Sequence, residues 1–232
     1  MTRPRKIILA ILVLFTLLVV GLASLLQWAL HRVQPYYQTA LATDKQTLQT
    51  ASRRLESRLT AIASMAQQSV PWEALFTDSD VNGWLAVAMK EKFPDWLPEN
   101  VSDLRIALTK KCLLAGFHYQ DTRYDTIISL RVVPFMAEAN VLAIRLEGAR
   151  AGALPIPLEQ VVRVCRTGAL QRHIPVRWTH QENCPLALLP IDHWLSTDTR
   201  QRQLETIELG AGQLRITGSS EAVEPKPASR PL

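Results

Sequence analysis

The chain has 232 residues, with 26 lysine and arginine residues against 21 aspartate and glutamate residues and a formal net charge of +5 at pH 7. Three of the basic residues, Arg3, Arg5 and Lys6, lie within the first six positions, and no run of five or more like charges occurs elsewhere. This distribution excludes a nucleic-acid-binding surface of the usual basic kind. The length of about 200 residues beyond the N-terminal segment predicts one globular domain with its own core.

Residues 7–26 are apolar without a single charge, and only Thr16 and Ser24 interrupt them with polar groups. A helix of that length rises about 1.5 Å per residue and covers the roughly 30 Å hydrocarbon core of a bilayer. The basic residues before it predict a cytoplasmic stub (1–6), a transmembrane signal anchor (7–28) and an extracytoplasmic bulk at the plasma membrane. A cleavable signal peptide is the rival interpretation. The run exceeds the roughly 7 to 15 residues of a signal sequence, and this length favours the anchor.

An amphipathic juxtamembrane helix is predicted for residues 29–70. It is expected to run without interruption from Gln34 to Gln68. Leu41, Leu48, Leu55 and Ile62 recur every seven residues along it. Such a narrow apolar stripe fits a helix packed on the domain or a short self-associating stalk. The lack of a second apolar heptad position favours packing on the domain.

An extracytoplasmic domain is predicted for residues 71–218. It begins with an apolar connection, Trp72–Phe76, and then a helix closed by Pro94. The predicted structural cap of this helix consists of Thr77, Asp78, Asp80 and Asn82. Thr77 is a plausible N-cap, the acids suit the positive end of the helix dipole, and Asn82 is expected to bond a neighbouring backbone group.

The same residues begin a calcium-loop pattern, D-x-D-x-N-G, from Asp78 to Gly83. The twelfth position of that loop requires a bidentate glutamate, and here it is Met89. We therefore predict a capped helix and no metal.

Beyond residue 100 the apolar period changes from helical to two, which is typical of half-buried strands. The pattern predicts an antiparallel β-meander, with a hairpin connection through Pro134–Glu138. A helix and four further strands follow, and residues 219–232 are expected to form a disordered tail. The sum is an α+β fold with helices packed on the meander. The predicted elements are strands 101–109, 112–119, 124–133 and 139–147, helix 158–170, and strands 176–179, 186–189, 204–209 and 213–217.

Three cysteines are widely spaced along the chain: Cys112, Cys165 and Cys184. In an exported domain one pair can be oxidised, and the predicted pair is Cys112 with Cys184. Cys165 falls in an apolar helical pattern and is expected to be a buried small hydrophobe.

Two short motifs accompany the N-terminal membrane segment: T-D-S-D-V-N at 77–82 and G-A-L-P-I-P-L at 152–158. With the order of elements, they resemble the YpmS-like family of membrane-anchored envelope proteins over residues 75–218. That resemblance implies no catalytic residues to transfer, because the family is mostly functionally undefined. A looser likeness to tubular lipid-binding proteins is an analogy of fold alone.

No glycine-rich phosphate loop, G-x-S-x-G motif or histidine pair with metal-ligand spacing occurs in the sequence. His118, Asp121 and Asp125 lie near one turn and form a conceivable acid–base or metal cluster, although solvated polar residues are commoner there. The prediction is a protein that is not an enzyme and needs no cofactor.

The ligand or interface candidates are apolar residues around a segment with two prolines, F-P-D-W-L-P at 93–98. The prolines hold this segment out of regular structure, so its apolar side chains are expected to line a groove or touch a membrane. The candidates are Phe93, Trp96, Leu97 and Trp84.

Three functions remain open at this point. The first is a non-enzymatic binding or assembly module of the cell envelope, tethered to the membrane and contacting an envelope protein. The second is a lipid-binding or lipid-handling domain with an apolar groove. The third is an enzyme with an unrecognised site. An apolar cavity favours the second, and a filled core with one exposed patch favours the first.

Overall fold

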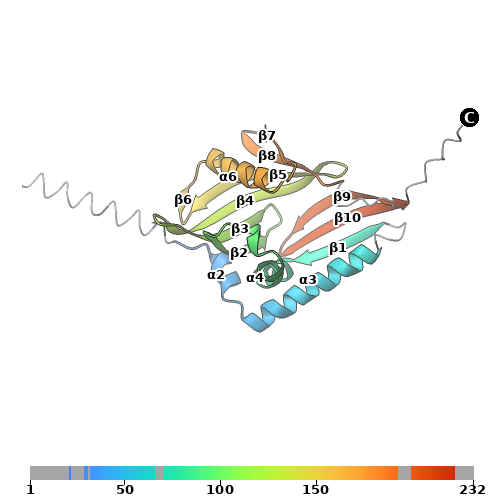
Figure 1. Ribbon diagram of the computed structural model, residues 1–232, viewed down its shortest axis with the longest axis horizontal. Helices are drawn as coiled ribbons and strands as arrows, with labels where there is room; N and C mark the ends of the chain where they lie inside the picture. Colours follow the sequence, from blue (N-terminus) through green and yellow to red (C-terminus); the bar gives the residue numbers. More distant parts are fainter. Residues whose placement is uncertain (1–20, 22–28, 31, 66–70, 193–199, 223–232) are drawn as a thin grey trace, which may run out of the picture.

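The computed structural model describes residues 21, 29–30, 32–65, 71–192 and 200–222, and its fold is α+β (Figure 1). The helical elements are α2 (Pro35–Leu41), α3 (Lys45–Met65), α4 (Asp78–Ala86), α5 (Ala88–Lys92), the 3-10 turn η1 (Pro94–Trp96) and α6 (Leu158–Gln171). The strands are β1 (Trp72–Thr77), β2 (Val101–Leu108), β3 (Leu113–Gln120), β4 (Asp125–Glu138), β5 (Val141–Ala151), β6 (Leu154–Pro155), β7 (Arg177–Gln181), β8 (Cys184–Pro190), β9 (Arg200–Gly210) and β10 (Gln213–Ala222).

The strands of the described residues form two antiparallel sheets. The larger, seven-stranded sheet has the order β2-β3-β4-β5-β8-β7, with β6 paired to β5. Its first four strands are neighbours in sequence order, so the predicted meander is confirmed. The smaller sheet has the order β1-β10-β9, and β9 and β10, which contain the predicted strands 204–209 and 213–217, form a hairpin.

One face of the larger sheet is apolar from strand to strand. Cross-strand partners share a face, and three such pairs are Leu113 with Val132, Ala115 with Leu130, and Phe117 with Ile128. Helix α4 packs on this face, because Leu113 and Ala115 contact the cluster that contains Leu85 and Met89. The smaller sheet covers the same face further along, where Met136 and Leu142 pack against Trp72. We call this face of the larger sheet the inner face.

The predicted uninterrupted helix from Gln34 to Gln68 is wrong. The chain forms α2 and α3 instead, separated at Ala42–Asp44, because the Asp44 carboxylate accepts a hydrogen bond from the Thr47 backbone N–H at 2.9 Å. An aspartate in this position starts a new helix. Helix α3 then packs against α4 and β1 and buries Ala51, Ser52 and Leu55, as expected for a helix packed on the domain.

Three other predicted boundaries are also corrected. Trp72–Phe76 is not a connection but lies within strand β1, whose partner β10 is remote in the sequence. Pro134 lies inside β4 and not in a hairpin connection. Strand β3 pairs with β4 only as far as Val132, so the missing N–H of Pro134 removes no hydrogen bond between β3 and β4. Strand β10 continues to Ala222, four residues into the predicted tail.

The predicted Cys112–Cys184 disulfide is wrong, because all three cysteines are free. Cys112 lies just before β3 and Cys184 begins β8, with β4 and β5 between them. Neighbouring strands are about 4.8 Å apart, so this separation exceeds the roughly 7 Å limit for bridged Cα atoms. Cys165 is exposed rather than buried, because α6 turns Val162 toward the sheet instead.

None of the described helices is both long enough and apolar enough to cross a membrane. The predicted stub (1–6) and signal anchor (7–28) lie outside the described residues apart from Gly21, and so do residues 66–70 and the tail beyond Ala222.

Helix α2 packs on the outer face of the larger sheet through two tyrosines. Gly116 makes this approach possible, since a Cβ atom there would lie 2.7 Å from Cδ2 of Tyr37. The Tyr37 hydroxyl donates to the backbone oxygen of Asp103 at 2.9 Å. Burial, as the main cause, raises the pKa of Tyr36 and that of Tyr37 to about 12.

These two raised pKa values predict a loss of stability in alkali. Below about pH 10 tyrosine is neutral in both the folded and the unfolded chain. Between pH 10 and 12 the unfolded state releases its tyrosine protons first, so the melting temperature should fall as the pH rises. A Tyr36→Phe, Tyr37→Phe variant should lose less stability over this range in a thermal melt series. Tyr124→Phe, at an exposed position, is the control, and an equal loss in all three chains would contradict the prediction.

Candidate binding groove

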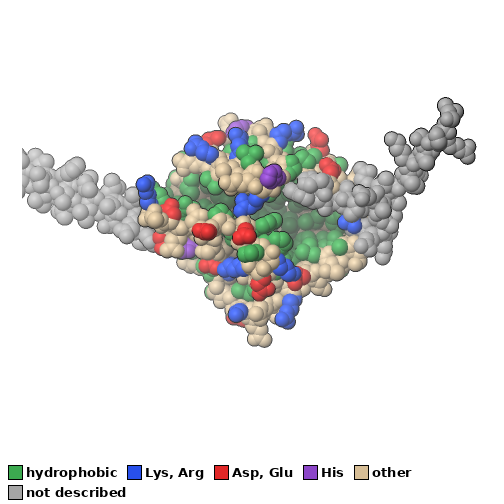
Figure 2. Space-filling model, in the orientation of Figure 1, with side chains coloured by type: hydrophobic (Ala, Val, Ile, Leu, Met, Phe, Trp, Pro, Cys, Tyr) green, Lys and Arg blue, Asp and Glu red, His purple; other side chains and the backbone are tan. Residues whose placement is uncertain are grey.

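A groove lies on the inner-face side of the sheet, between α6 and the segment from Lys90 to Val101. Its volume is about 770 Å³. We call it the α6 groove. Figure 2 shows this side of the molecule hollowed at its centre, with hydrophobic side chains in the depth of the hollow.

Three of the four predicted ligand residues form one aromatic chain beside the first wall and do not line the groove themselves. The ring centroids of Trp84 and Phe93 lie 6.1 Å apart, and those of Phe93 and Trp96 lie 5.4 Å apart. Trp84 is half-buried in the core, whereas Phe93 is 41% exposed and Trp96 is 56% exposed. The fourth residue, Leu97, lines the groove directly and packs against the core below it.

Helix α6 supplies the second wall, which the sequence analysis did not identify. Val162 is buried, while Val164, Thr167, Gly168 and Gln171 line the groove. Val164 is 71% exposed, a large exposure for a valine. A signal was present in the sequence: the run V-V-R-V-C at 161–165 has more apolar residues than one buried face of a helix requires.

Charged side chains border the groove and join its two walls. The Arg172 guanidinium of α6 donates to the backbone oxygens of Asp95 and Trp96, at 3.2 and 2.9 Å. Lys90 forms an ion pair with Asp103 at 3.2 Å. Arg163 and Glu99 are exposed and also line the groove. The walls are therefore held together at one end, and the border presents both charges to a ligand.

The middle strands of the inner face are only partly covered. Three separate buried clusters make up the described core, centred on Trp72, on Leu85 and on Leu55. The strand residues between α6 and α4 belong to none of these clusters and stay half-buried: Phe117, Ile128, Leu130 and Val132. The domain thus keeps apolar strand surface that its own side chains do not fill.

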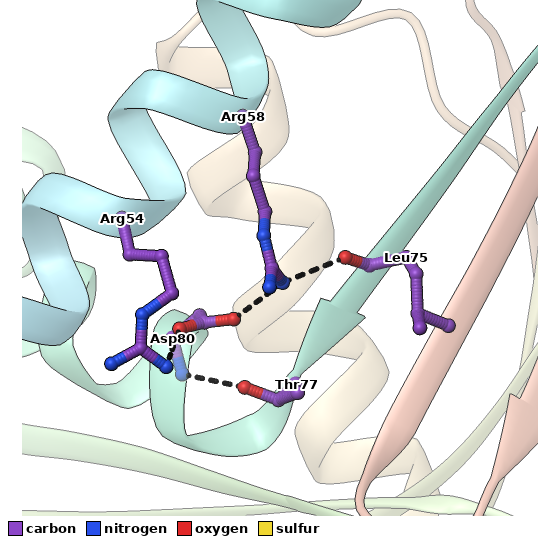
Figure 3. Close-up of polar contacts among 5 residues, drawn as sticks. All are labelled: Arg54, Arg58, Leu75, Thr77 and Asp80. Atoms are coloured by element: carbon purple, nitrogen blue, oxygen red, sulfur yellow. Dashed lines mark hydrogen bonds and ion pairs between the residues drawn. The ribbon is translucent and has the colours of Figure 1, made fainter.

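The predicted cap residues form a structural unit of α4 rather than part of the groove (Figure 3). The Thr77 hydroxyl accepts a hydrogen bond from the Asp80 backbone N–H at 3.1 Å. The Asp80 side chain is fully buried, with Arg58 at 2.7 Å and Arg54 at 3.2 Å from its carboxylate oxygens. Arg58 also donates to the backbone oxygen of Leu75, so this unit joins α3, β1 and α4.

Asn82 and Gly83 complete this unit. The Asn82 amide donates to the backbone oxygen of Ile106 at 2.8 Å and accepts from the Ile106 N–H at 2.7 Å. Gly83 lets α4 approach α3, since its Cβ would lie 2.6 Å from that of Ala51. Residues 78–86 are helical, not an open calcium loop, and the described residues contain no cluster of three acidic, histidine or cysteine side chains that could hold a metal.

The structure brings together only two members of the predicted cluster of His118, Asp121 and Asp125. The ring of His118 lies 2.7 Å from Asp125, whose side chain is 62% exposed, and 3.4 Å from the Ser102 hydroxyl. Asp121 instead accepts from the backbone N–H groups of Arg123 and Tyr124 and holds the β3–β4 turn. Ser102, which the sequence analysis did not consider, lines the α6 groove. This arrangement is a partly exposed hydrogen-bonded pair beside a turn.

Comparison of the chain with protein-family profiles, curated proteins and solved structures gives no match. The interpretation of the site therefore rests on its geometry.

Proposed function

We propose that the chain is a non-enzymatic, membrane-tethered binding module of the cell envelope, with the α6 groove as its ligand site. The tether is the apolar run of residues 7–26, preceded by three basic residues and therefore oriented with the domain on the outer side of the plasma membrane. The resemblance to the YpmS-like family remains a prediction that agrees with this assignment.

The observation that carries the proposal is the presence of apolar side chains on both walls of one groove and beside it. Leu97 lines the first wall, and Val164, which is 71% exposed, lines the second. Trp96, which is 56% exposed, adjoins the first wall next to Leu97. Exposed apolar surface gathered at one concavity is typical of an interaction site. A volume of about 770 Å³ also falls within the usual range of small-molecule sites.

A lipid or other amphiphile with an acyl chain is the second, more specific candidate function, that of a lipid-handling domain. The half-buried strand residues Phe117, Ile128 and Leu130 favour it, because they add apolar surface on the inner face of the sheet. Arg163 and Lys90 at the border provide charges for a polar headgroup. A protein ligand with apolar side chains would contact the two walls of the groove but not the strand residues.

Blocking the α6 groove provides the test. A Cβ atom on Gly168 would meet only the Arg172 guanidinium, at 3.6 Å, so a leucine here fits and projects into the groove. Gly168→Leu should therefore keep or slightly raise the melting temperature, since leucine favours helix over glycine by about 0.8 kcal/mol. It should also greatly weaken binding of a fluorescent fatty acid, measured by fluorescence titration on residues 29–232.

Cys165→Leu is the matched control. It adds the same side chain to the same helix at an exposed position that does not line the groove. Equal binding of the fatty acid by both variants would contradict a lipid in the α6 groove. Failure of the wild-type domain to bind it would favour a protein ligand.

A further inference from the structure

Ala29 and Leu30, which precede α2, are fixed to the turns of the meander by hydrogen bonds. The Ala153 N–H donates to the backbone oxygen of Ala29 at 2.7 Å. The hydroxyl of Thr126, a buried side chain, donates to the backbone oxygen of Leu30 at 2.8 Å. Carbonyl groups at the end of a helical segment need such partners, and here the domain supplies them.

Gly152 shows how close this contact is. Its φ is +58°, and a Cβ atom there would lie 2.2 Å from the oxygen of Leu30 and 2.4 Å from that of Ala29. Its own N–H donates to the backbone oxygen of Ile127 at 2.8 Å. Residues 29 and 30 are therefore in direct contact with the β5–β6 turn and with the start of β4, and no free linker separates them from the domain.

The apolar run ends at Leu26, three residues before Ala29. Three residues span at most about 11 Å even when fully extended. Ala29, which Ala153 of the β5–β6 turn holds, therefore lies within that distance of the end of the apolar run. If this run crosses the bilayer, the turns lie beside its headgroup layer.

The β3–β4 turn presents an aromatic and a basic residue at this position. The Asp121 carboxylate accepts hydrogen bonds from the backbone N–H groups of Arg123 and Tyr124 and from the Tyr119 hydroxyl. Asp125 is paired with His118. Both acids of the turn are thus engaged within it, while Arg123 is exposed and Tyr124 is 58% exposed.

We infer that Arg123 and Tyr124 contact the phospholipid headgroups of the bilayer that holds residues 7–26, so that the domain stands on the membrane in a fixed orientation. The inference rests on the anchor included in the proposed function. Tyrosine is favoured at the membrane–water interface, and arginine is attracted to anionic lipids. The end of the molecule with α2 and β6 is then nearest the membrane, and β9 and β10 extend away from it (Figure 1).

Photo-crosslinking of the full-length chain in intact cells tests this inference. A benzophenone amino acid replaces Tyr124 in one chain, Gln203, exposed on β9, in a second, and Leu17, in the apolar run, in a third. We expect lipid adducts at positions 124 and 17 and none at position 203, by mass spectrometry of the purified chains. Lipid at position 17 without lipid at 124, or a protein adduct at 124, would overturn the inference and leave the anchor standing. No lipid at position 17 would overturn the anchor as well.

A second set of chains tests the contact with residues 29–30. Gly152→Ala, combined with the crosslinker at position 124, should abolish the lipid adduct there and leave the adduct at 17 unchanged. Thr126→Val, which removes only the hydrogen bond to Leu30, should reduce the adduct at 124. Unchanged adducts at 124 in both variants would overturn the fixed orientation.

Discussion

Replacing Asn82 with alanine is expected to lower the free energy of unfolding by about 2 to 5 kcal/mol, because it leaves two buried backbone groups without partners. Asn82 is 8% exposed, and its amide bonds both the N–H and the carbonyl oxygen of Ile106. Both hydrogen bonds are buried, since Ile106 is only 9% exposed. Helix α4 should also loosen from β2, which it contacts through this pair.

Urea unfolding of the Asn82→Ala domain measures this change. Gln46→Ala, at an exposed position of α3, is the control and should stay within about 0.5 kcal/mol of the wild type. A change at Asn82 as small as that of the control would show that α4 is held to β2 by apolar packing alone.

Replacing Gly83 with valine should be at least as damaging, by about 3 kcal/mol or more. The added Cβ would lie 2.6 Å from Cβ of Ala51, 2.7 Å from the oxygen of Leu48 and 2.7 Å from the nitrogen of Ser52. Two of these atoms belong to the backbone of α3 and cannot rotate away. The two helices must therefore separate, which exposes Ala51 and Ser52, now 1% and 3% exposed.

Gly168→Ala is the control for this prediction, because it is also a helical glycine but the added atom meets only the Arg172 guanidinium, at an ordinary contact distance of 3.6 Å. It should stabilise α6 by roughly 0.5 to 1 kcal/mol, the usual gain of alanine over glycine in a helix. Equal thermal stability of the Gly83 and Gly168 variants would contradict the close approach of α3 and α4.

The sequence predicts those parts of the fold that depend on local patterns. Alternating apolar residues place the meander strands, and the Thr77 hydroxyl lies where a helix cap is expected. Strand β1 is missed although Trp72, Ala74 and Phe76 alternate with exposed residues, because its partner β10 is about 140 residues away. Asp44 is missed because the heptad of leucines continues across the break between α2 and α3.

The candidate site is likewise predicted only where it depends on a local sequence pattern. Two prolines within six residues indicate an irregular apolar segment, and the structure brings Trp84, Phe93 and Trp96 together there. The opposite wall comes from α6, more than 60 residues later, and only the folded sheet brings it to this segment. Gly168 within α6 and Arg172 just after its end carry no local sign of a groove, because neither shows in the sequence what lies next to it in space.

The central claim is that the α6 groove binds an amphipathic ligand, and native mass spectrometry tests it most directly. The domain is expressed from Ala29, because Thr126 and Ala153 donate hydrogen bonds to the backbone of residues 29 and 30. It is purified without detergent and then extracted with organic solvent. We expect a reproducible lipid mass on the wild-type domain that is absent from Gly168→Leu and retained by Cys165→Leu. A lipid retained equally by both variants would contradict the α6 groove as the ligand site, and a ligand-free wild-type mass would contradict a lipid as its ligand.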